Sequence, residues 1–78
     1  MHVNVRFLCV DTPVGDIEVE EGATIEGVLR YCVEEYDIKM SLNKLLNYLF
    51  LVNKNPARPD FKLSEGDNLV IVRPPLGG

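Results

Sequence analysis

The protein has 78 residues, a formal net charge of −4 at pH 7 and two cysteines. A chain of this length forms one domain with a small core, which argues against a self-contained enzyme with an enclosed substrate pocket. Without a basic stripe to displace counterions, nucleic acid is not an expected partner. The sequence has no signal peptide and no apolar run of about 18 residues, so we expect a cytoplasmic protein that does not bind membranes.

Residues 2–10 alternate between apolar and polar side chains, with Val3 and Cys9 on the same face. This period of two predicts a half-buried strand. Turn formers occupy residues 11–16, and Ile17 then alternates with its glutamate neighbours. The first two strands are therefore expected to form a hairpin with a rather long loop.

A helix is predicted over residues 25–36, with Thr24 as its N-cap. Glu26 and Arg30 form an i,i+4 pair on its polar face. Its apolar stripe has helical spacing and consists of Ile25, Val28, Leu29, Cys32, Val33 and Tyr36. Cys9 and Cys32 occupy core positions on facing elements, and they are expected to be buried reduced thiols without metal-ligand spacing.

The second half of the chain contains a segment with two interpretations. In residues 37–47, Ser41 either caps a short helix or belongs to an apolar loop. Residues 48–52 are apolar on both faces and predict a strand that ends at the turn formers of residues 53–56. A short edge strand over residues 57–62 is then expected, with Pro59 at its margin.

The last predicted elements are a tight turn at residues 63–67 and a strand at residues 68–73. One amphipathic helix needs a sheet face to cover, so the order of elements predicts an α+β β-grasp roll with a mixed four- to five-stranded sheet. The first and last strands should be parallel neighbours. Residues 1–73 form the expected domain, and residues 74–78 form a flexible tail.

The tail has the composition of a chemical handle. Pro74 and Pro75 stop the last strand and stiffen the exit, whereas Gly77 and Gly78 lack a Cβ and can enter a narrow channel. Five extended residues reach about 17 Å, enough to place the last carboxylate in another protein's active site. The alternative is a polar tail that merely ends in glycine.

A docking patch is expected on the open face of the sheet. If Leu69 and Ile71 face the helix, Val70 and Val72 point to the open face. If Leu49 also points inward, the other side chains of the middle strand join that face, near Leu8. The predicted docking patch consists of Phe50, Val52, Val70 and Val72. The alternative is that residues 37–47 fold over these side chains.

These residues resemble the ubiquitin-like sulfur-carrier proteins. The MoaD type, the small subunit of molybdopterin synthase, is most similar, and the ThiS type, the carrier for thiazole synthesis, is next. The resemblance is specific over residues 49–78, and the double proline favours the MoaD type. The residues that carry it are Leu51-Val52-Asn53, Leu63-Ser64-Glu65-Gly66-Asp67 and Pro74-Pro75-Leu76-Gly77-Gly78.

The resemblance implies a carrier rather than an enzyme. An E1-like adenylyltransferase would activate the carboxyl of Gly78 with ATP, and the resulting thiocarboxylate would donate sulfur in molybdopterin biosynthesis. Partners would be that enzyme and a sulfur-accepting subunit, MoaE-like or a thiazole synthase. The channel of the partner would hold Gly77, Leu76, Pro75 and Pro74. No catalytic or metal residue and no bound cofactor is implied for this chain. The alternatives are a ThiS-like carrier, a ubiquitin-like protein modifier and a plain interaction domain.

Overall fold

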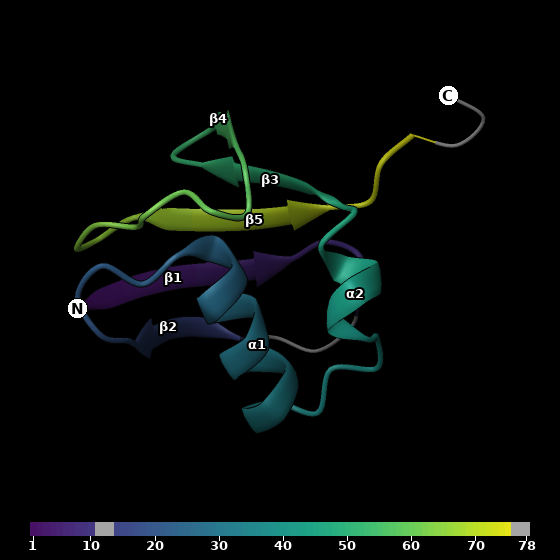
Figure 1. Ribbon diagram of the computed structural model, residues 1–78, viewed down its shortest axis with the longest axis horizontal. Coiled ribbons are helices and arrows are strands. Elements are labelled where there is room, and N and C mark those ends of the chain that lie inside the picture. The colour runs from purple at the N-terminus through teal and green to yellow at the C-terminus, as the bar shows by residue number, and fades with distance from the viewer. Residues whose placement is uncertain (11–13, 76–78) are drawn as a thin grey trace.

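The computed structural model describes residues 1–10 and 14–75. Within them the chain forms β1 (His2–Phe7), β2 (Gly15–Glu18), α1 (Ile25–Glu35), α2 (Leu42–Leu45), β3 (Leu49–Val52), β4 (Asn55–Ala57) and β5 (Asn68–Val72) (Figure 1). The strands form one five-stranded sheet in the order β2-β1-β5-β3-β4. β1 and β5 are parallel neighbours, and the other strand pairs are antiparallel.

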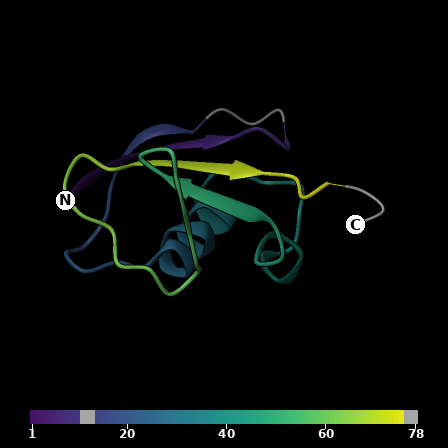
Figure 2. The ribbon, with the colours of Figure 1, turned by 90° about the horizontal axis from the view of Figure 1, so that it is seen from above.

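The sheet and the helices form two layers. Seen from above, both helices lie on the same side of the sheet, and none of the described residues forms a helix over the opposite face (Figure 2). The core lies between the layers and includes apolar side chains of the strands, α1 and α2. This confirms the predicted α+β β-grasp fold, including the parallel pairing of the first and last strands.

β1 alternates as predicted, with Val3, Val5 and Phe7 buried. The strand ends at Phe7, earlier than the predicted residue 10. The Leu8 N–H still donates to the Ile71 carbonyl at 2.9 Å, so the pairing with β5 extends one residue past the strand.

Helix α1 confirms the predicted cap and apolar stripe. The Thr24 hydroxyl accepts a hydrogen bond from the Gly27 N–H at 3.1 Å, which satisfies a donor in the first turn. The fully buried side chains are Ile25, Val28, Leu29 and Cys32. On the exposed face Arg30 binds Glu26 at 3.2 Å. Thus the stripe sets which face of the helix covers the sheet.

Residues 37–47, for which a short helix or an apolar loop was expected, contain the short helix α2. The Ser41 hydroxyl accepts a hydrogen bond from the Lys44 N–H at 3.2 Å and caps α2. Leu45 is fully buried, and Ile38 in the preceding loop is also buried. Because α2 lies on the same side of the sheet as α1, it does not cover the open face (Figure 2).

The predicted edge strand is displaced. β4 covers Asn55–Ala57, and residues 58–62 are not in a strand. Asn53 and Lys54 have positive φ values of 51° and 73°. Positive φ at both central residues is the geometry of a two-residue hairpin turn, so the chain reverses sooner than the four turn formers indicated. Pro56 is tolerated because β4 is an edge strand.

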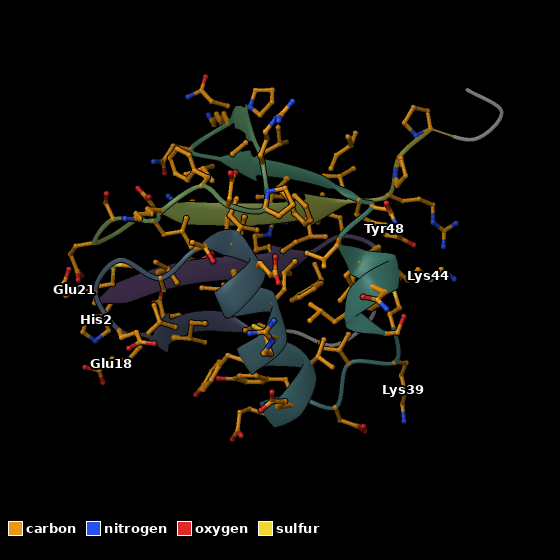
Figure 3. The ribbon with its side chains drawn as sticks, viewed as in Figure 1. His2, Glu18, Glu21, Lys39, Lys44 and Tyr48 are labelled. Atoms are coloured by element: carbon orange, nitrogen blue, oxygen red, sulfur yellow. The ribbon has the colours of Figure 1, made fainter. Side chains whose placement is uncertain are left out.

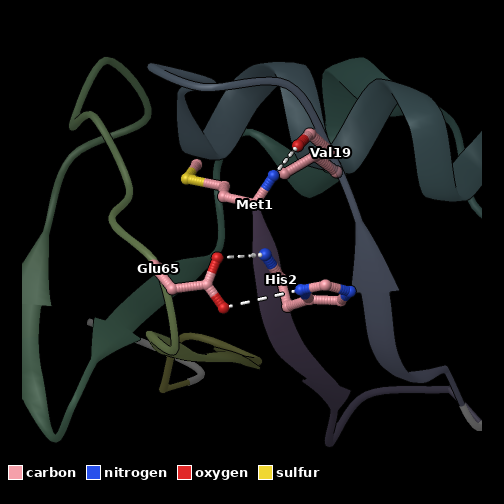
Figure 4. Close-up of polar contacts among 4 residues, drawn as sticks. All are labelled: Met1, His2, Val19 and Glu65. Carbon is pink, nitrogen blue, oxygen red and sulfur yellow. Dashed lines mark hydrogen bonds and ion pairs between the residues drawn. The ribbon is translucent and has the colours of Figure 1, made fainter.

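Two polar contacts fix the ends of the central strands. Figure 4 shows the amino group of Met1, which donates to the Val19 carbonyl at 2.6 Å. It also shows the His2 N–H, which donates to a Glu65 carboxylate oxygen at 2.8 Å. β1 is therefore tied to β2 on one side and to the turn before β5 on the other.

That turn, at residues 63–67, is tight as predicted. Gly66 has a φ of +82°, a conformation that glycine adopts without a steric penalty. The Asp67 carboxylate accepts hydrogen bonds from the Ser64 N–H at 2.8 Å and from the Asn53 amide at 2.9 Å. Asp67 thus links this turn to the β3–β4 turn.

Candidate docking face and C-terminal exit

The predicted docking patch is wrong in its β3 residues. Phe50 is 3% exposed and Val52 is 5% exposed, so both belong to the core. Residues directly opposite each other in an antiparallel pair share a face. Phe50 lies opposite Ile71 and Val52 lies opposite Leu69, and both of these partners are fully buried. The pairing with β5 therefore turns the even-numbered residues of β3 inward.

The two predicted patch residues of β5 do lie on the open face, as expected. Val70 and Val72 are half-buried and alternate with the buried Leu69 and Ile71. Leu49, which was expected to point inward, is 49% exposed. Leu49 and Leu51 thus replace Phe50 and Val52 on the open face.

Across β1, β5 and β3, the open face consists of three cross-strand rows. They are Leu8–Val72–Leu49, Arg6–Val70–Leu51 and Asn4–Asn68–Asn53. The first row is wholly apolar, the second is mixed, and the third consists of asparagines. We call Leu8, Leu49, Leu51, Val70 and Val72 the apolar patch. Leu8 is 57% exposed, and contiguous exposed apolar side chains of this kind mark an interaction surface.

The polar end of the open face has a different chemistry. An open depression there has Leu51 and Val70 as its apolar residues. Its polar lining consists of Asn4, Arg6, Asn53, Lys54 and Asn68. Arg6 and Lys54 place two cations at this depression in a protein of net charge −4. The face therefore offers apolar contact at one end and cationic groups toward the other.

The chain leaves the sheet at the apolar end of this face. β5 ends at Val72, in the wholly apolar row, and Arg73 follows as an exposed residue. Pro74 is half-buried and Pro75 is exposed. In Figure 1 this exit lies at the same end of the molecule as α2. The predicted tail residues Leu76, Gly77 and Gly78 lie outside the described residues.

The two cysteines differ in environment. Cys32 is fully buried, and burial raises the pKa of its thiol to about 12. Cys9 packs against the core but is only half-buried, so its predicted full burial is wrong. Desolvation raises the pKa of its thiol, and a backbone hydrogen bond and the charge of Arg73 oppose that rise. Both thiols are free. Raised pKa values disfavour the nucleophilic thiolate at both positions.

In the part of the chain that the structure describes, no three His, Cys, Asp or Glu residues are grouped so as to hold a metal ion. None of the helices described there is long and apolar enough to cross a bilayer.

Together, the two-layer fold, the open face and the adjoining exit define a small ubiquitin-like domain whose apolar patch lies beside the exit of its chain. The ThiS family model matches residues 7–78, and the chain belongs to the ThiS family. This is a family of small sulfur-carrier proteins, generally non-catalytic, that work with E1-like activating enzymes and sulfur-accepting synthases. The resemblance seen in the sequence is thus confirmed at the level of the family. A comparison with curated proteins gives no match.

The sequence contained one signal for the residues that were missed. Asn53 is a polar residue at the end of the apolar run, and it is exposed. Residues two and four positions earlier share its face in a strand. Counting back from Asn53 therefore places Leu51 and Leu49 on the open face.

Proposed function

We propose that this protein is a sulfur carrier for molybdopterin biosynthesis, and that Gly78 is the residue that carries the sulfur. One observation carries the proposal: the β5 strand of a ThiS-family domain leads directly into Pro74-Pro75 and then Gly77-Gly78. The double proline favours this pathway, because it is the feature in which the sequence resembles the MoaD type.

The chemistry requires activation by a partner. A terminal carboxyl has a pKa of about 3.3–3.7, so at neutral pH it is an anion and a poor electrophile. An E1-like enzyme would join the carboxylate of Gly78 to AMP from ATP, with release of pyrophosphate. A sulfur nucleophile at the oxidation level of sulfide, such as hydrosulfide, would then attack the acyl carbon and displace AMP, which leaves the thiocarboxylate directly. ATP would belong to the partner, and the carrier itself would bind no cofactor.

The docking surface in this proposal is the apolar patch. Its outermost row lies at the end of β5, so a partner bound there would have the tail within reach. Pro74, Pro75, Leu76 and Gly77 would pass through a channel of the partner, where the absent Cβ of glycine permits close enclosure.

The terminus is tested by activation of the purified protein, whose intact mass is first checked for a chain ending at Gly78. Incubation with the E1-like enzyme and ATP should release pyrophosphate, and a sulfur donor should then exchange one oxygen for sulfur on the final residue. Deleting Gly78 moves the carboxylate back by roughly 3.5 Å. Errors of about 1 Å can cost around a hundredfold in rate, so the deletion should abolish activation. Full activation of the shortened chain would refute the proposal.

The docking surface is tested with a matched pair on β5. Val70→Asp places a charge in the middle row and should weaken binding of the E1-like enzyme by more than about 1–2 kcal/mol. Asn68→Asp adds the same charge to the same strand and face, in the asparagine row, and should have a smaller effect. Equal binding of both variants and the parent protein would remove the apolar patch from the proposal.

A second pathway has its own support, because the matching family is described as ThiS. The thiocarboxylate form should therefore be offered to a molybdopterin synthase large subunit and to a thiazole synthase in parallel. Sulfur transfer to the first alone supports the proposal, and transfer to the second alone supports thiazole synthesis. Protein adducts of higher mass in the native cell would instead support a ubiquitin-like modifier.

A further inference from the structure

The β2 strand leaves one edge of the sheet unpaired within the described residues. Met1 and Val19 exchange two backbone hydrogen bonds, of 2.6 and 2.8 Å. In an antiparallel ladder every second residue pair is hydrogen-bonded. Two residues before Val19, the backbone N–H and C=O of Ile17 therefore also point toward β1, where Ile17 lies opposite Val3. Asp16 and Glu18 therefore direct their backbone N–H and C=O groups away from the sheet, where another strand can pair with them.

A groove of about 380 Å³ runs beside this edge, between the end of β2 and α1. Its apolar lining includes Val19, Ala23 and Val28, and the half-exposed ring of Tyr31 borders it. Gly27 lines the groove without a side chain, which keeps the helix side open. Apolar side chains from a strand added to β2 can enter this groove on the helix side of the sheet.

The negative charges around the β2 edge favour a partner strand that carries positive charges. Asp16 and Glu18 are exposed on the open face, opposite Asn4 and His2. Glu18 lies at the rim and also lines the groove, together with Glu20. No lysine or arginine is among the residues that line it. In Figure 3, Glu18 and Glu21 lie at one end of the molecule, and Lys39 and Lys44 lie at the other. A second copy of this chain would bring like charges together along the same edge.

We propose that the β2 edge and its groove bind an extended segment of a partner protein in which apolar residues alternate with lysine or arginine. The segment adds a strand to the sheet through Asp16 and Glu18. Its apolar side chains enter the groove, and its basic side chains, on the other face, meet the two carboxylates. β2 lies at the opposite end of the strand order from β3 and β4, so both this edge and the apolar patch can be occupied together.

The test uses a six-residue peptide of alternating lysine and valine, with blocked ends, and amide chemical shifts of the full chain at 150 mM salt. Saturable shifts should centre on Asp16, Glu18 and Val19. A lysine–serine peptide of the same charge should bind about tenfold more weakly or worse, since it cannot fill the groove. Equal binding of the two peptides, or no saturable shifts, would overturn the proposal.

Two charge-reversed variants distinguish specific binding at the β2 edge from general attraction between the basic peptide and an acidic protein. Asp16→Lys with Glu18→Lys should weaken the lysine–valine peptide about tenfold or more. Glu34→Lys with Glu35→Lys makes the same change of charge at the end of α1 and should leave binding nearly unchanged. Gly27→Leu should fill the groove and weaken binding while the helix is retained, because leucine favours helix over glycine. Equal losses for the two charge-reversed pairs, or no loss for Gly27→Leu, would overturn the proposal.

Discussion

Truncation of two adjacent β3 residues should affect different properties: Phe50→Ala should mainly lower stability, and Leu49→Ala should mainly weaken binding. Phe50 is 3% exposed and packs in the core, so Phe50→Ala should lower the free energy of unfolding by about 3–5 kcal/mol. A domain of this length has a total stability of about 4–12 kcal/mol. Leu49 is 49% exposed, and the loss of its half-buried side chain should cost about 1 kcal/mol. Leu49→Ala should nevertheless weaken binding of the E1-like enzyme, because Leu49 belongs to the apolar patch.

Urea unfolding followed by circular dichroism measures both stabilities, and calorimetric titration with the E1-like enzyme measures binding. If Phe50→Ala does not fold, Phe50→Leu provides a smaller deletion at the same position and should still cost more stability than Leu49→Ala. An equal or reversed order of stability losses would refute the register of β3. Unchanged binding of the E1-like enzyme by folded Leu49→Ala would refute the role of Leu49 in docking.

Three further predictions concern single groups. Thr24→Ala removes the acceptor of the Gly27 N–H and should lower the free energy of unfolding by about 1 kcal/mol, whereas Thr24→Ser should not. Gly66→Ala should cost about 1–2 kcal/mol in urea unfolding from its φ of +82° alone, since no atom lies within 4 Å of the added Cβ; a neutral result would contradict that conformation. Because burial raises the pKa of Cys32 to about 12, iodoacetamide at pH 8 should modify Cys9 first and Cys32 only in urea, as read by mass spectrometry. Equal native rates would disprove the burial of Cys32.

Alternating and helical patterns predicted the parts of the fold that have one polar and one apolar face. β1 and α1 each bury one face, so their side-chain periods identified Val3, Val5, Val28 and Leu29 as core residues. The Thr24 cap could also be predicted from nearby residues. The Thr24 hydroxyl accepts its hydrogen bond from the Gly27 N–H, only three residues later in the chain. Local patterns therefore sufficed for the sheet and helix that define the fold.

The orientation of β3 could not be predicted from the alternation of its own apolar residues. β3 is apolar on both faces, so a period of two fits either orientation, and a shift of one residue exchanges the faces completely. The choice is made by pairing across the sheet, where Phe50 meets Ile71. A turn was predicted at residues 53–56, but its two-residue form was not, because the positive φ values of Asn53 and Lys54 occur without glycine. Those two features account for the wrong patch residues and for the displaced edge strand.

The central position of β5 has a consequence for the order of assembly during synthesis. β1 and β3 are never neighbours, because β5 lies between them. A chain that ends before Asn68 contains two hairpins, and no β-ladder of the described residues joins them directly. The strand that joins them is also the one that leads into the Pro-Pro and Gly-Gly segment. Completion of the fold and display of that segment are therefore consecutive steps, and a chain cut short before β5 lacks both.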